Sequence, residues 1–173
     1  MSDTLITVIA IALAAVLMFV FPLMTMSDRT DDVSQLAVET ATTDFVDEVR
    51  TTGKITPDKY SKFIENIGST GNTYNVEMQI QVLDENPGKK TTQTTKDKIG
   101  ENVYYSVYTS QIEEVLQNGK NYNLKEGDIF SVNVKNTNQT LAQQLKNFFY
   151  TVVGNDTYTI AASHGGMVTA TGK

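Results

Sequence analysis

Few residues in this chain have the type and spacing that catalysis requires. His164 is the only histidine, and no cysteine, aspartate or glutamate lies within five residues of it. A metal site or a catalytic triad would therefore have to draw every other member from distant parts of the chain. We interpret His164 as a structural turn residue. The pairs Asp47-Glu48 and Glu113-Glu114 are predicted to be solvated surface charges, because adjacent residues on a helix point about 100° apart.

Metal and phosphate chemistry are also weakly supported. Four residues of a polar stretch could gather a Ca²⁺ ion, but their spacing matches no EF-hand signature: Asp84, Glu85, Asn86 and Asp97. Gly165-Gly166 lacks the third glycine and the following helix of a phosphate-binding loop. The tyrosines at 104, 105 and 108 could form a contact patch, although aromatic residues in strands more often belong to a core. We predict no catalytic residue, no cofactor and no metal site, and hence no enzyme.

The elements that hold these residues begin with an apolar segment, since no charged residue stands between Asp3 and Asp28. About 20 apolar residues at a rise of about 1.5 Å cross a hydrocarbon core of about 30 Å, so Leu5 to Met26 is long enough. A cleaved signal peptide is the alternative, but it needs a basic leader and a small-residue cleavage site after the apolar core. Because the first four residues contain no Lys or Arg, we predict a retained transmembrane helix over residues 4–27.

The net charge of −6 is unevenly distributed along the chain. Residues 26–53 contain seven acidic residues against Arg29 and Arg50, whereas from Lys54 onward twelve lysines balance twelve acidic residues. No basic stripe is present to neutralise phosphates, so nucleic acid is not an expected partner. Residues 28–53 are predicted to continue the span as an acidic amphipathic helix, because no Gly or Pro interrupts them before Gly53.

Four apolar residues of this acidic segment recur at three- and four-residue steps: Val38, Ala41, Phe45 and Val49. This spacing places them on one face of a helix. Two interpretations remain open at this point. The stripe packs on the protein's own sheet, or it also meets identical or related helices as an assembly interface.

Residues 54–173 are predicted to form one α+β domain. Thr56 and Pro57 are typical of a helix start, and the alternation from Tyr74 to Val82 is the strongest strand signal in the chain. A polar loop is expected at 84–101. Helices with capping boxes are expected from Ser110 and Thr140, and further strands at 103–108, 129–134 and 158–162. The predicted fold is a small, mostly antiparallel sheet with packed helices.

This layout resembles type IV pilin-like proteins, and most closely the TadE-type pseudopilins of Gram-positive tight-adherence (Tad) pili. The resemblance is carried by the span with Pro22 and by three stretches: Thr51 to Tyr60, Gly71 to Tyr74, and Gly127 to Val134. It implies a single-pass protein of the cell membrane with its C-terminal domain outside the cell. Pilins usually have a basic leader ending in Gly and a glutamate near the start of the apolar segment. This chain has neither, so the resemblance implies an accessory, membrane-retained member.

Two functions follow from these observations. The first is a non-catalytic component of a Tad or type IV pilus, or of a related secretion machine, that assembles through its N-terminal helix. Its expected partners are the lipid bilayer and other pilin-like subunits or pilus-machine membrane proteins, with self-association as a further option. The second is a membrane-tethered adhesion or ligand-binding module that uses the loop from Asn86 to Lys98.

Overall fold

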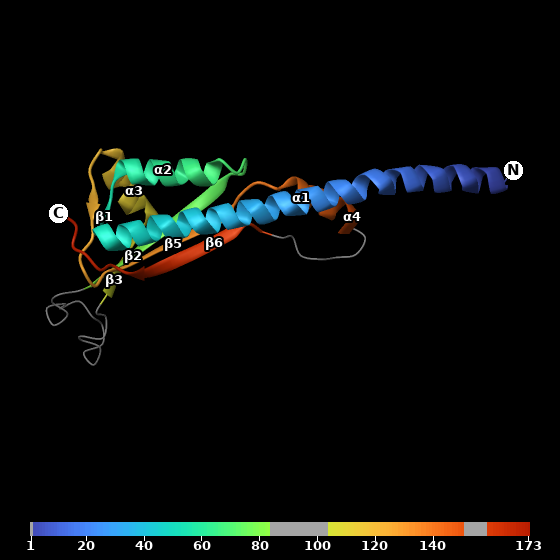
Figure 1. The fold of residues 1–173 in the computed structure, drawn as a ribbon. Coiled ribbons are helices and arrows are strands. Elements are labelled where there is room, and N and C mark those ends of the chain that lie inside the picture. Colours follow the sequence, from blue (N-terminus) through green and yellow to red (C-terminus); the bar gives the residue numbers. More distant parts are fainter. Residues whose placement is uncertain (1, 84–103, 151–158) are drawn as a thin grey trace, which may run out of the picture.

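The computed structural model describes residues 2–83, 104–150 and 159–173 of the chain (Figure 1). The helices are α1 (Ser2–Thr52), α2 (Pro57–Gly68), α3 (Thr109–Gln117) and α4 (Leu141–Tyr150). The strands are β1 (Lys54–Ile55), β2 (Tyr74–Leu83), β3 (Tyr104–Tyr108), β4 (Tyr122–Asn123), β5 (Ile129–Asn136) and β6 (Ala161–Met167). The predicted loop at 84–101 lies outside the described residues, and so do the residues suggested for Ca²⁺.

Helix α1 is a single helix of 51 residues that runs through Pro22 without a break. Its first half extends beyond the rest of the protein, and its second half lies along the sheet (Figure 1). Among the described residues, α1 is the one helix long and apolar enough to cross a membrane. The apolar stretch of α1 is not buried inside the protein. The apolar segment and the acidic segment therefore form one continuous helix.

The main sheet has four antiparallel strands in the order β3-β2-β5-β6. Its central register pairs Ile80 of β2 with Phe130 of β5, and Phe130 in turn with Gly166 of β6. Strands β1 and β4 form a separate antiparallel pair of two residues each. This pair was not predicted, because two residues are too short to show an alternating pattern. The α+β class and the antiparallel sheet are confirmed.

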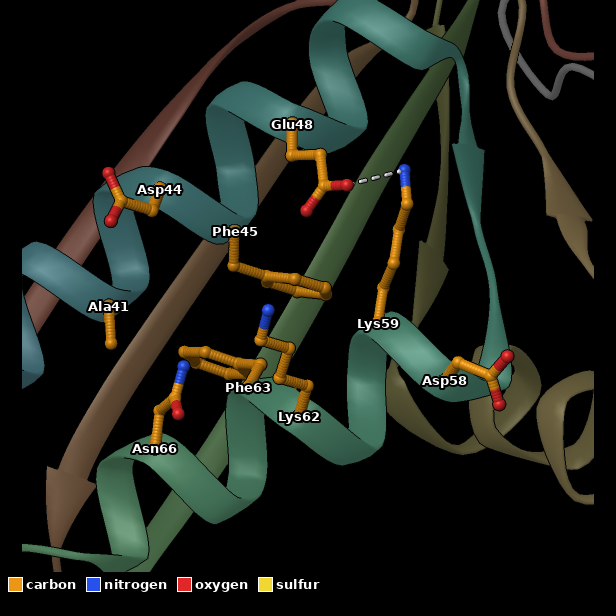
Figure 2. Close-up of a pocket in the computed structure, with 9 residues that line it drawn as sticks. All are labelled: Ala41, Asp44, Phe45, Glu48, Asp58, Lys59, Lys62, Phe63 and Asn66. Atoms are coloured by element: carbon orange, nitrogen blue, oxygen red, sulfur yellow. Dashed lines mark ion pairs between the residues drawn. The ribbon is translucent and has the colours of Figure 1, made fainter.

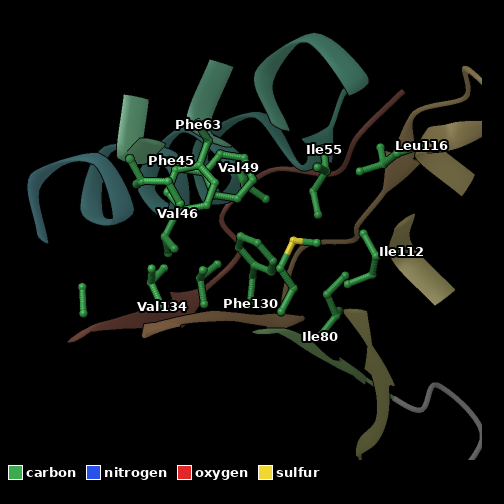
Figure 3. Close-up of a cluster of buried hydrophobic side chains, with 14 of the residues drawn as sticks. Phe45, Val46, Val49, Ile55, Phe63, Ile80, Ile112, Leu116, Phe130 and Val134 are labelled. Carbon is green, nitrogen blue, oxygen red and sulfur yellow. The ribbon is translucent and has the colours of Figure 1, made fainter. Parts of the chain in front are cut away.

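The hydrophobic core lies between α1, α2, α3 and one face of the sheet (Figure 3). Phe45 of α1 is at its centre, stacked on Phe63 of α2 with ring centroids 4.5 Å apart and 6° between the ring planes. The edge contact of Phe45 with Phe130 of β5 has a centroid distance of 5.9 Å. The three rings thus join two helices to the centre of the sheet, a geometry that aromatic pairs favour.

The four residues suggested as an assembly interface, Val38, Ala41, Phe45 and Val49, belong to the core of the folded domain. Val38 and Val49 are fully buried, Phe45 is 4% exposed and Ala41 is packed against the same core. Their apolar surface is already covered by the protein's own sheet and α2. The stripe therefore follows the first interpretation, in which an amphipathic helix packs on its own domain.

The boundary predicted at Gly53 marks the end of α1 in the sequence, but the residues before and after it pack into the same core. The core includes four residues of α1, namely Val38, Phe45, Val46 and Val49. Gly53 ends α1 with a φ of +66°, and a Cβ there would lie 2.1 Å from the carbonyl oxygen of Ala170. Only glycine fits this position without strain. The folded unit consequently includes the second half of α1 together with residues 54–173.

Of the two capping boxes expected from the sequence, one is confirmed and one is wrong. At α4, the hydroxyl of Thr140 accepts from the Gln143 backbone N–H at 3.2 Å, and the Gln143 side chain accepts from the Thr140 N–H at 3.1 Å. The N-cap of α3 is Tyr108, two residues before the Ser110 that the box predicts. Its capping side chain is Gln111, which accepts from the backbone N–H of Tyr108 at 3.1 Å.

Candidate functional site

Helix α1 attaches to β6, the edge strand of the sheet, through side-chain contacts at both ends of the strand. The side-chain amide of Gln35 donates to the carbonyl of Ala161 at 2.6 Å and accepts from its N–H at 3.0 Å. At the other end, Arg50 Nε donates to the carbonyl of Met167 at 2.9 Å. These contacts form hydrogen bonds with main-chain groups that an edge strand otherwise leaves unpaired.

His164 lies in the middle of this contact, in strand β6 and not in a turn as predicted. Its Nε2 is 3.4 Å from Asp47 Oδ1, and the same oxygen accepts from Arg50 Nη1 at 2.7 Å. A Cβ on Gly166 would lie 2.6 Å from Cζ of Arg50, so glycine leaves room for the guanidinium. The His-Gly-Gly sequence therefore serves the packing of α1 on β6.

The carboxylate pairs also have partners within the fold. Lys59 Nζ pairs with Glu48 Oε1 at 3.0 Å, and the hydroxyl of Tyr60 donates to Glu113 Oε1 at 2.6 Å. Glu113 is thus a structural acceptor and more than a surface charge. Burial, and then the bond to Glu113, raise the pKa of Tyr60 far above the ordinary tyrosine value. Within the described ranges, no group of three or more His, Cys, Asp or Glu side chains is placed to hold a metal ion.

A charged groove of about 310 Å³ separates α1 from α2 (Figure 2). Asp44 and Glu48 extend from α1, while Lys59, Lys62 and Asp58 belong to α2. The Phe45 and Phe63 rings beneath these residues are almost fully buried. Since the rim carries both signs of charge and one pair is already closed, the groove offers no strong field for a charged ligand.

The outer side of α1 carries exposed apolar residues that lie outside the predicted stripe. Met26, Val33 and Leu36 are 68%, 62% and 63% exposed. Their seven- and three-residue steps place them on one face of the helix, away from the buried stripe. A hollow of about 610 Å³ runs beside this face, and its lining residues are Met26, Arg29, Thr30, Val33, Ser34, Ala37, Ser69 and Thr70. The sequence contains this helical spacing, but polar residues stand between the three apolar ones, so no clear apolar pattern marks the face.

A buried carboxylate connects α1 to α4 close to the end of the apolar segment. Asp31 is 5% exposed, and its Oδ2 accepts from the hydroxyl of Thr140 at 2.6 Å. Because Thr140 is also the N-cap of α4, this bond fixes the start of α4 against α1.

Two of the β3 tyrosines, which were considered as a contact patch, have largely exposed side chains: Tyr105 is 50% exposed and Tyr108 is 58% exposed.

Comparison with protein-family models, with curated proteins and with solved structures finds no match to this chain.

Proposed function

We propose that this protein is a membrane-anchored, non-catalytic, pilin-like component of a Tad or type IV pilus or of a related secretion machine. In this proposal it assembles through its N-terminal helix. One observation carries the proposal: α1 is a single 51-residue helix that is apolar and uncovered in its first half and packed on an antiparallel sheet in its second. Because α1 is uninterrupted, it joins the membrane segment to the folded domain without a flexible linker.

The outer face of α1, defined by Met26, Val33 and Leu36, supports assembly through the helix. These side chains are exposed on a segment that otherwise carries acidic residues, and they continue the apolar surface of the first half. Exposed apolar residues that share one face of a helix are typical of a protein contact surface. We assign the assembly interface to this outer face, in place of the buried stripe.

The alternative function, a tethered ligand-binding module, depends on the loop from Asn86 to Lys98. That loop lies outside the described residues, so the described fold supplies no argument for it.

Cysteine crosslinking tests the assembly interface directly, because the chain contains no native cysteine. We expect Val33→Cys and Leu36→Cys to give crosslinked species in membranes of the native host under mild oxidation or with a short bifunctional reagent. Glu114→Cys is the control, since it is exposed but belongs to α3 and not to α1. Phe45→Cys should not crosslink, because that position is buried in the core.

The proposal is contradicted if the Val33 and Leu36 variants yield only monomers, or if Glu114→Cys crosslinks as efficiently as they do. Mass spectrometry of the crosslinked species identifies the partner. A pilin-like subunit, a pilus-machine membrane protein or a second copy supports the proposal, whereas an unrelated partner argues against it.

A further inference from the structure

Helix α4 lies beside the last turns of the apolar half of α1 (Figure 1). Within Asp3 to Met26, Val20 and Met24 are half-buried and every other residue is exposed. These two residues and Asp31 are on the same side of α1, the side that faces the rest of the protein. The bond between Thr140 and Asp31 fixes the start of α4 just beyond the end of the apolar segment, about 7.5 Å along the helix axis from Met26.

Helix α4 begins with an exposed apolar side chain. Leu141, the first residue of α4, is 70% exposed. Gln144, three residues further along, is also exposed, and Leu145 is half-buried. The ten residues of α4 contain no acidic side chain and a single lysine, Lys146.

We propose that α4 is a membrane-contact helix: its first turn, with the exposed side chain of Leu141, rests in the interfacial layer of the bilayer that α1 crosses. This inference rests on the membrane anchoring within the proposed function. The domain then sits directly on the lipid surface and does not stand away from it on a stalk. The partner of this turn is the headgroup and upper acyl-chain region of a lipid bilayer.

The length of the apolar segment supports the placement of α4 in the interfacial layer. Leu5 to Met26 spans about 33 Å at a rise of about 1.5 Å per residue, slightly more than a hydrocarbon core of about 30 Å. Val20 lies six residues before Met26, or about 9 Å along the helix axis. Interfacial helices bury their apolar faces to a depth of about 5 to 10 Å. The level at which α4 meets α1 is therefore the level of the interface.

The charged residues near α4 also agree with a position of this helix at the membrane interface. Asp28 and Arg29 are the first charged residues after the apolar segment, and they mark the level at which α1 enters water. Asp31, the next acidic residue, is directed inward and satisfied by Thr140, so its charge is withdrawn from the surface that faces the lipid. Nothing acidic on α4 itself opposes contact with headgroups.

Single cysteines labelled with an environment-sensitive fluorophore measure the depth of each position in the full-length chain. The test positions are Leu141→Cys and Gln144→Cys, both on the exposed side of α4. The matched control is Ile64→Cys, an apolar residue of α2 that is 38% exposed, and Met18→Cys in the apolar half of α1 reports anchoring. The proteins are reconstituted at low density into phosphatidylcholine vesicles that contain lipids with a quencher at the headgroup or deep in the acyl chain.

We expect lipids with shallow quenchers to quench the Leu141 label, and aqueous iodide to quench it about threefold less than the Ile64 label, because an interfacial position excludes water. Lipids with deep quenchers should quench the Met18 label. A Leu141 label as open to iodide as the Ile64 label overturns the α4 inference while leaving the anchor intact. A Leu141 label shielded from both iodide and lipid quenchers places this turn against protein and overturns the inference too. A Met18 label open to iodide overturns both the anchor and the α4 inference.

Discussion

At the scale of single residues, the hydrogen bond between Tyr60 and Glu113 joins α2 to α3. The Tyr60 hydroxyl donates to Glu113 Oε1 at 2.6 Å, and the tyrosine is half-buried beside Phe45. Burial raises the pKa of Tyr60 first, and the hydrogen bond and the negative charge of Glu113 raise it further. The folded protein therefore holds this proton more tightly than the unfolded chain does.

This difference in pKa predicts a loss of stability at alkaline pH. Below pH 10.0, the ordinary tyrosine value, both states keep the proton and stability does not depend on this group. Above it the unfolded chain releases the proton and the folded protein does not, so the free energy of unfolding falls as the pH rises. In Tyr60→Phe we expect a free energy of unfolding about 1 kcal/mol lower at pH 7, from the lost hydrogen bond, and a shallower decline above pH 10.

Thermal unfolding followed by circular dichroism between pH 7 and pH 11 measures both effects. Tyr108→Phe is the control, because that side chain is 58% exposed and its removal should leave the pH profile unchanged. The interpretation fails if Tyr60→Phe declines above pH 10 as steeply as the unsubstituted protein.

At the scale of elements, α4 depends on one side chain for its attachment. The hydroxyl of Thr140 caps the helix by accepting from Gln143 N–H, and it donates to the buried carboxylate of Asp31. The cap and the contact with α1 therefore use the same oxygen atom. A substitution at this position breaks the start of α4 and leaves Asp31 buried without this donor.

We expect Thr140→Val to lower the free energy of unfolding by about 2 kcal/mol, because it combines the loss of an N-cap with a buried acceptor left unsatisfied. Hydrogen exchange of the α4 amides should rise more than exchange in the sheet, since the helix loses its attachment before the core opens. Thr140→Ser keeps the hydroxyl and should remain close to the unsubstituted protein. Equal losses in the valine and serine variants would show that methyl packing, and not the hydroxyl, holds α4.

At the scale of the whole molecule, the second half of α1 belongs to the folded domain. Val38, Phe45, Val46 and Val49 are part of the same core as the sheet residues. Each such side chain contributes about 1.5 to 3 kcal/mol by burial, so the four together contribute about 6 to 12 kcal/mol. This sum is comparable to the total stability of a typical domain, about 5 to 15 kcal/mol.

Truncation separates the apolar segment from the folded unit. We expect a fragment of residues 27–173 to fold as a water-soluble domain, because it keeps every α1 residue of the core. A fragment of residues 54–173 should fail to fold or should aggregate, since the sheet loses the helix that covers it. Circular dichroism and the dispersion of amide NMR signals compare the two. Cooperative unfolding of the shorter fragment would contradict the shared core.

Several parts of this fold could be predicted because their causes are local. An uncharged apolar run identifies α1, alternation from Tyr74 onward identifies β2, and Thr140 with Gln143 identifies the start of α4. Each of these signals depends on residues within a few positions of one another. Two features that the sequence did not predict depend on contacts between distant residues: the pairing of β1 with β4 and the place of His164 in β6. The start of α3 is a local exception, because Gln111 caps the backbone of Tyr108 three residues before it.

By itself, the sequence determined that this protein has a long apolar helix continued by an acidic amphipathic one, followed by an α+β region without a convergent catalytic motif. Only the tertiary structure decided which apolar faces are covered. Val38 and Val49 are buried, whereas Val33 and Leu36 are exposed, although all four are aliphatic residues of one helix. Periodicity shows which residues share a face, but the element that covers a face comes from a distant part of the chain, and it is this long-range packing that leaves the outer face of α1 open.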